Sequence, residues 1–198
     1  ERPMTWAEMK HITLQKIDEA TGEDNSEYMS QMAPPANEAL QLLAGAGKEV
    51  IRSYEIVQTG EETARQRYDM KELTPDWVEL QSVYFESGTT YGQSSNYSLE
   101  GSSVLVLEPV AGVWRVYYQA YPYEIGDSTP EDEPLAIDPE VAVIIPLYIA
   151  SQIYKHDNVS LATIWRNEFE IAREALLMKY QQNKVMGQAG FVSLKGVW

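Results

Sequence analysis

The sequence predicts an α+β fold: a helical bundle built from N- and C-terminal helices, an inserted antiparallel β domain of sandwich or barrel type, and an extended C-terminal tail. Two changes of pattern predict it. Helical periodicity gives way after Lys48 to short segments in which apolar and polar residues alternate, and it returns at Asp138. Since each helical flank needs a partner to cover its apolar face, the flanks are expected to pack together. The expected divisions are 1–47 for N-terminal helices, 48–125 for the β domain, 126–137 for an acidic linker, 138–182 for a helical hairpin and 183–198 for a docking tail.

The N-terminal part predicts three helical pieces. Thr5 and Glu8 have the spacing of a capping box, in which each side chain satisfies a free backbone N–H at a helix start. The first helix is expected to stop near Thr21-Gly22. Two further pieces are expected at about 26–32 and 36–44, and the glycines at 45 and 47 are expected to end the last one.

The middle of the chain predicts an antiparallel β domain. Its turn signals are mostly glycines, and they separate short runs with strand character. These runs cover residues 50–57, 64–70, 77–85, 96–100, 103–108 and 113–121. Five or more strands at this spacing are typical of a small sandwich or barrel.

A helical hairpin is predicted from Asp138 onward, where a carboxylate and then Pro139 favour a helix start. Residues 141–145 are apolar on every face and Pro146 follows, so this helix is expected to be kinked and buried all round. It is too short to cross a bilayer, which needs about 20 apolar residues. The second helix is expected at about 160–181, packed on the first through Leu161, Ile164, Trp165, Ala172 and Leu176.

Composition excludes several classes of function. The net charge of −15 disfavours a protein that grips nucleic acid, because such proteins neutralise phosphates with Lys and Arg. The absence of cysteine excludes disulfides, thiolate metal sites and cysteine catalysis. No motif reports catalysis, so an enzyme is not expected.

The remaining candidates for chemistry favour structural roles. The glycines before Lys48 lack the first glycine and the Ser/Thr of a phosphate-binding loop, and are interpreted as a helix stop. His11 and His156 have no His or Cys at ligand spacing. The acidic run 127–133 lacks the spacing of a calcium loop and is interpreted as solvated linker. Neither a cofactor nor a metal is expected.

Aromatic residues and the C-terminal tail remain as candidate binding elements. Trp and Tyr are frequent in the β segment, where they fill cores or, if exposed, can contact sugars or other subunits. Tyr117 and Tyr118 must point to opposite faces of their strand. The tail carries five large apolar side chains that are costly to leave in water: Phe191, Val192, Leu194, Val197 and Trp198. It either docks on a partner or folds back onto its own domain.

The stretch 141–176, with its apolar helix, the turn SQIYKHDN and the helix IWRNEFE, resembles head–tail connector (adaptor) proteins of tailed bacteriophages. The helix ANEALQLLA at 36–44 fits the same pattern. The resemblance implies a structural virion protein: a homo-oligomeric, twelve-fold ring beneath the portal that connects capsid to tail and lets DNA pass without binding it. It further implies assembly in the host cytoplasm, contacts with tail or neck proteins, no membrane association, and a C-terminal segment that docks on the portal.

An alternative function stays open from the sequence. The chain could be a phage tail or surface binding module whose aromatic β domain recognises a saccharide or host ligand. The β segment of roughly 75 residues is larger than a minimal adaptor requires, and the resemblance leaves its purpose open.

Overall fold

The computed structural model describes residues 3–17 and 25–193, with the backbone alone at Ser26 and at 183–193. The chain divides into two compact units, one formed by residues 1–48 with 122–198 and the other by residues 49–121. The first is helical and the second contains both sheets, so the fold is α+β, as the sequence predicts.

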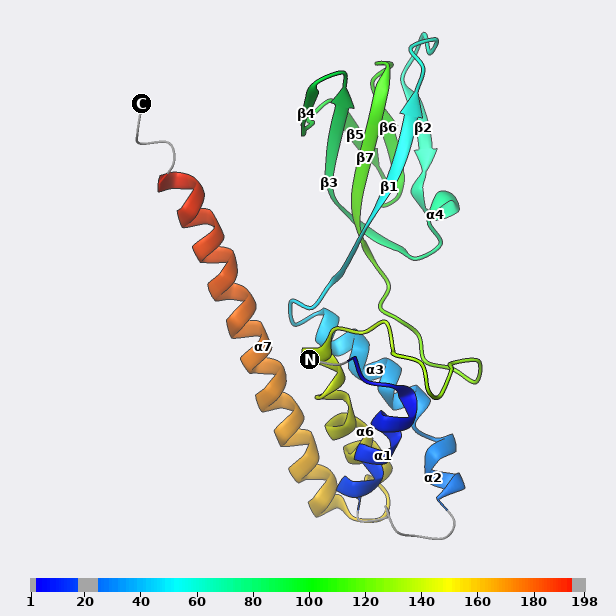
Figure 1. Ribbon diagram of the computed structural model, residues 1–198, viewed down its shortest axis with the longest axis vertical. Coiled ribbons are helices and arrows are strands. Elements are labelled where there is room, and N and C mark those ends of the chain that lie inside the picture. Colours follow the sequence, from blue (N-terminus) through cyan, green and yellow to red (C-terminus); the bar gives the residue numbers. More distant parts are fainter. Residues whose placement is uncertain (1–2, 18–24, 194–198) are drawn as a thin grey trace. The chain divides into compact units, whose positions relative to one another are not determined.

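In the helical unit, α6 is surrounded by other helices: it contacts α1, α3 and α7 (Figure 1). Seven side chains of this nine-residue helix are buried, Tyr148 and Ile149 among them. The helices of the unit are α1 (Trp6–Lys16), α2 (Ser26–Ser30), α3 (Ala33–Ala44), α5 (Pro139–Ala142), α6 (Ile145–Ile153) and α7 (Val159–Ser193). The shared core therefore joins helices from both ends of the chain.

Two helix starts follow directly from local chemistry. The capping box at α1 is present: Glu8 N–H donates to Thr5 Oγ1 at 3.2 Å, and Thr5 N–H donates to Glu8 Oε2 at 2.9 Å. Asp138 caps α5 by accepting the Glu140 N–H at 2.8 Å, and Pro139 occupies the first turn. The expected stop of the first helix near Thr21-Gly22 lies outside the described residues.

The first helix of the C-terminal hairpin is broken rather than kinked. α5 ends at Ala142 and α6 begins at Ile145, which places Pro146 in the first turn of α6. A proline costs nothing there, because no backbone N–H of that turn has an intrahelical acceptor. The expectation of burial on every face is wrong at one position, because Val143 in the break is 59% exposed.

The last helix, α7, differs from expectation in length and in its buried face. It continues to Ser193, whereas the sequence predicts an end near residue 182 and an extended tail after it. The intervening segment contains no proline, and each of its two glycines costs a helix only about 0.5–1 kcal/mol. Ile164, expected to pack on the preceding helix, is 49% exposed, and Phe169 is fully buried in its place.

The β unit is a two-sheet sandwich. The first sheet has the order β1-β7-β3-β4 and the second the order β2-β6-β5, and every pairing is antiparallel. The strands are β1 (Val50–Gln58), β2 (Gln66–Asp69), β3 (Trp77–Ser87), β4 (Thr90–Gln93), β5 (Tyr97–Glu100), β6 (Val104–Leu107) and β7 (Gly112–Ala120). Strand β4 and the one-turn helix α4 (Met70–Leu73) were not predicted.

Alternation along β7 sets the two faces of the first sheet. Trp114, Val116 and Tyr118 are buried against the second sheet, whereas Arg115 and Tyr117 lie on the other face. The expectation of opposite faces for Tyr117 and Tyr118 is therefore met, with Tyr118 in the core. A register shift in β3 between Leu80 and Ser82 marks a bulge.

The acidic segment before α5 has exposed side chains, but its backbone is fixed to α1. Ala7 N–H donates to the Glu131 carbonyl at 3.0 Å, and Leu135 N–H donates to the Met4 carbonyl at 2.9 Å. Asn37 additionally holds Ile125 through two hydrogen bonds of 2.8 Å, one in each direction. This segment is therefore part of the helical unit.

Candidate functional site

The glycines and histidines that the sequence offered as possible site residues lie in surroundings that fit structural roles. Gly45 caps α3 and Gly47 has a φ of +88°, which confirms the interpretation of these glycines as a helix stop. His11 is exposed and contacts Gln15 at 3.1 Å, and His156 is exposed in the turn before α7. Within residues 3–17 and 25–193, no three His, Cys, Asp or Glu side chains gather as a metal site would require.

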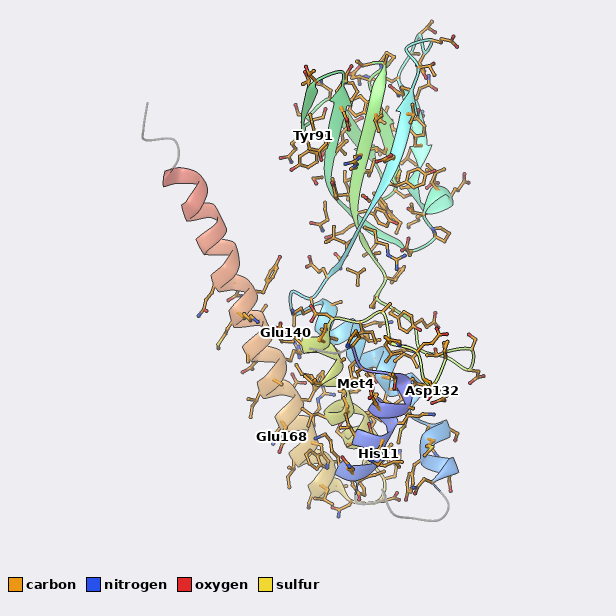
Figure 2. All side chains as sticks on the ribbon, in the orientation of Figure 1. Met4, His11, Tyr91, Asp132, Glu140 and Glu168 are labelled. Carbon is orange, nitrogen blue, oxygen red and sulfur yellow. The ribbon has the colours of Figure 1, made fainter. Side chains whose placement is uncertain are left out.

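Lys48 follows the two glycines that resemble the end of a phosphate-binding loop. In the structure it forms ion pairs with acidic side chains, and we call the group of Lys48, Asp138, Glu140 and Lys179 the ion-pair junction. The Nζ of Lys48 lies 2.7 Å from Glu140 Oε2 and 3.0 Å from Asp138 Oδ2. Hydrogen bonds from Lys179 and Lys48 lower the pKa of the Glu140 carboxyl to about 2. Partial burial lowers the pKa of Lys48, but its two carboxylate partners outweigh this and raise it. One carboxylate thus links the end of α3, the start of α5 and the middle of α7 (Figure 2).

An uncovered apolar stripe runs along α7. Ile164, Ile171 and Met178 are 49%, 68% and 61% exposed. Residues seven apart lie on one side of a helix, so these three side chains share a face; Phe169 and Leu176 point to the opposite side and are buried. We call this set the α7 stripe. Sequence reasoning missed it, although the repeated spacing of seven was visible.

The α7 stripe lies on a helix whose charges balance. Between residues 159 and 182, three basic residues stand against three acidic ones, in a chain with a net charge of −15. Arg166 and Arg173 both pair with Glu170 on the side of the helix away from the stripe, with N–O distances of 2.7 and 2.6 Å. This helix can therefore approach another acidic chain without strong repulsion.

A second uncovered surface of the helical unit is a mostly apolar groove of about 530 Å³ along α1. Its lining residues are Met4, Ala7, Glu8, His11 and Ile12, and Figure 2 labels two of them, Met4 and His11. We call it the α1 groove.

The β unit carries a cluster of tyrosines on the outer face of its first sheet. Tyr84 on β3 stacks on Tyr91 of β4, with ring centroids 5.3 Å apart and an interplanar angle of 20°. Tyr117 on β7 meets Tyr84 edge-on at 5.5 Å. A shallow concavity of about 440 Å³ lies over these rings. We call its lining the tyrosine platform, formed by Ile51, Gln81, Ser82, Tyr84, Tyr91 and Tyr117.

Polar contacts hold the platform rings in place. A hydrogen bond with Tyr117 raises the pKa of the Tyr91 hydroxyl above its ordinary value. Arg115 lies 5.9 Å from the Tyr91 ring and forms an ion pair with Glu55 on β1. The hydrogen bonds with Glu55 and Tyr117 raise the pKa of the Arg115 guanidinium above its ordinary value. Arg115 therefore stays positively charged, and the carboxylate of Glu55 balances this charge. The sequence pointed to exposed aromatics here, but it could not say which ones would gather.

The five tail residues proposed for docking cannot be placed together. Phe191 and Val192 belong to the last turns of α7, where the backbone alone is described. Leu194, Val197 and Trp198 lie outside the described residues. None of the helices in the described part of the chain combines the length and apolar character that a membrane span requires.

Comparisons with known proteins give little further information. No protein-family model matches the chain, and no curated protein matches it. Among solved structures, it is similar to a chain from the neck of an empty gene transfer agent (GTA) particle, computed with C6 symmetry. The sequence identity is 10%, and the similarity covers 83% of this chain and 93% of that chain with a TM-score of 0.29. At this TM-score, no shared function follows from the similarity.

Proposed function

We propose that this chain is a structural virion protein, a head–tail adaptor that forms a ring beneath the portal, connects capsid to tail and surrounds the DNA passage. Its place is the neck of the virion, after assembly in the host cytoplasm. The role follows from the resemblance of residues 36–44 and 141–176 to such adaptors, and it needs no catalysis.

The observation that supports the ring most directly is the α7 stripe. The stripe has three large apolar side chains on one face of a helix, each about half exposed or more. Fully burying such a side chain stabilises a protein by roughly 1.5–3 kcal/mol, so a partner that covers the stripe gains part of this free energy. Side chains spaced seven residues apart form one continuous line along a helix, and a second helix or a groove can pack along such a line. The balanced charge of α7 makes a second copy of this acidic chain an acceptable neighbour.

A closed ring needs two different complementary surfaces on each subunit, because its contacts run head to tail. The helical unit offers two, the α7 stripe and the α1 groove. In the proposed ring, the stripe of one subunit packs into the groove of the next. Met4, Ala7 and Ile12 of the groove supply the apolar surface that this contact buries.

The test compares two substitutions that each add one negative charge to an exposed position of α7. Ile171→Glu places the charge on the stripe, and Gln181→Glu, the control, places it about 80° away. Native mass spectrometry and negative-stain electron microscopy, with and without portal rings, measure assembly. We expect rings from the wild type and the control, and none from Ile171→Glu. A wild type that stays monomeric under all conditions and is absent from virion necks would refute the proposed function.

The portal contact is proposed to involve the tail residues Phe191, Val192, Leu194, Val197 and Trp198. Deleting residues 187–198 should leave a folded protein that no longer co-sediments with portal rings, because α7 packs into the core of the helical unit through Phe169 and Leu176, which precede the deletion. Unchanged co-sedimentation would place the portal contact elsewhere. Native mass spectrometry and electron microscopy of the assembled rings also give the number of subunits, for which we expect twelve.

A further inference from the structure

We propose that the tyrosine platform of the β unit is a binding site for a neutral saccharide. This inference goes beyond the proposed neck function and does not depend on it.

The platform has the shape and the chemistry that a sugar ring requires. A pyranose presents a C–H face that packs on the face of an aromatic ring, and hydroxyl groups around its edge that need hydrogen-bond partners. Tyr91 is 51% exposed and offers such a ring. The Gln81 amide, the Ser82 hydroxyl and the tyrosine hydroxyls surround the concavity, so donors and acceptors lie beside the ring faces. The volume of about 440 Å³ is within the range of small-ligand sites.

The charges favour a neutral ligand over an anionic one. Every polar side chain that lines the concavity is uncharged. Arg115, which lies 5.9 Å from the Tyr91 ring, is paired with Glu55 and is not free to receive a carboxylate or sulfate. Acidic residues outnumber basic ones about two to one in residues 49–121, which repels polyanions.

The rings are fixed before any ligand arrives. Tyr84 is held between Tyr91 and Tyr117 by one stacked and one edge-on contact. Tyrosine has few rotatable bonds, and the contacts of the Tyr91 ring with Tyr84 and with the Arg115 guanidinium restrict them further. Binding therefore costs little side-chain entropy, which matters for a ligand that offers only weak individual contacts.

A protein partner fits the platform less well. Protein interfaces surround their aromatic anchors with further apolar side chains that exclude water. Ile51 is the single aliphatic side chain in this lining, and the remaining lining residues, tyrosines included, carry polar groups.

The test measures saccharide binding by the whole protein. Xylohexaose, maltohexaose, mannohexaose and hexa-N-acetylchitohexaose are the neutral probes, with polygalacturonate as the anionic comparison, in isothermal titration calorimetry. We expect at least one neutral probe to bind, with a dissociation constant of about 1 mM or below. Tyr91→Ala should weaken this binding at least about tenfold, and Gln81→Ala should weaken it through lost hydrogen bonds. Tyr91→Phe keeps the ring and should stay within a few-fold of the wild type.

The matched control is Tyr121→Ala, because Tyr121 is 59% exposed in the same unit but does not line the platform. It should bind like the wild type, and near-UV circular dichroism should show that all variants are folded. The proposal is overturned if no neutral probe binds, if Tyr91→Ala and Tyr121→Ala behave alike, or if polygalacturonate alone binds. Protection of the platform tyrosines by a neck protein, without saccharide binding, would show a protein contact instead.

Discussion

Two residues of α7, Phe169 and Ile171, are only two positions apart, and we predict that truncating Phe169 destabilises the protein strongly whereas truncating Ile171 hardly does. Phe169 is fully buried, with its ring centroid 4.9 Å from that of Tyr148 on α6 and the Arg166 guanidinium 5.7 Å from its centroid. Phe169→Ala should therefore lower the free energy of unfolding by about 3–5 kcal/mol, a large part of the usual 5–15 kcal/mol. Ile171 is 68% exposed, so Ile171→Ala should change it by no more than about 0.5 kcal/mol.

Urea titration followed by circular dichroism at 222 nm is the assay, because most of this signal comes from the helical unit. Protein concentration must be varied, since assembly through the α7 stripe would itself stabilise the folded chain. At low concentration the Ile171→Ala variant should match the wild type, and at high concentration it should be less stable. Equal losses for Phe169→Ala and Ile171→Ala at low concentration would show that the buried face of α7 is wrongly assigned.

Three further predictions concern the core, the ion-pair junction and the sandwich. Ile144→Asp places a carboxylate at a position only 8% exposed and should cost several kcal/mol by thermal melting, whereas Glu131→Ala removes one exposed ion pair and should cost at most about 1 kcal/mol. The pKa of Glu140 is lower in the folded chain, about 2, than its ordinary 4.5, so the stability it contributes is complete above about pH 4.5 and is lost as the pH falls toward 2. The difference in urea midpoint between wild type and Glu140→Gln should shrink over that range, and a constant difference would contradict the assignment. Gln58 is 2% exposed and its Oε1 accepts the Trp114 indole N–H at 3.2 Å, so Gln58→Leu should destabilise the β unit by about 1–3 kcal/mol, measured by tryptophan fluorescence.

Features set by neighbouring residues were predictable from the sequence. The capping box of Thr5 and Glu8 and the helix start at Asp138 depend on side chains that bond to backbone within three residues. The α+β class followed from the change of periodicity at Lys48, because helices and strands bury residues at different spacings.

Features that depend on a distant partner were not predictable. α7 has apolar residues on two faces, and only the position of α6 decides that Phe169 rather than Ile164 is buried. Strand β4 is an exception, because its partner β3 directly precedes it in the chain; with four residues, one of them Gly92, β4 was too short to be recognised. The tyrosine platform needs β3, β4 and β7 side by side, an order that no local pattern contains.

The division of the chain into units also constrains the order in which it can fold during synthesis. Residues 49–121 are continuous and can form their sandwich as soon as they leave the ribosome. In contrast, α1 and α3 bury their apolar faces against α6, which ends at Ile153. At 5–20 residues per second, the ribosome needs roughly 5–20 s to travel from the end of α3 to the end of α6. During this time α1 and α3 lack the helix that covers their apolar faces, so these faces stay open to other contacts until α6 is complete.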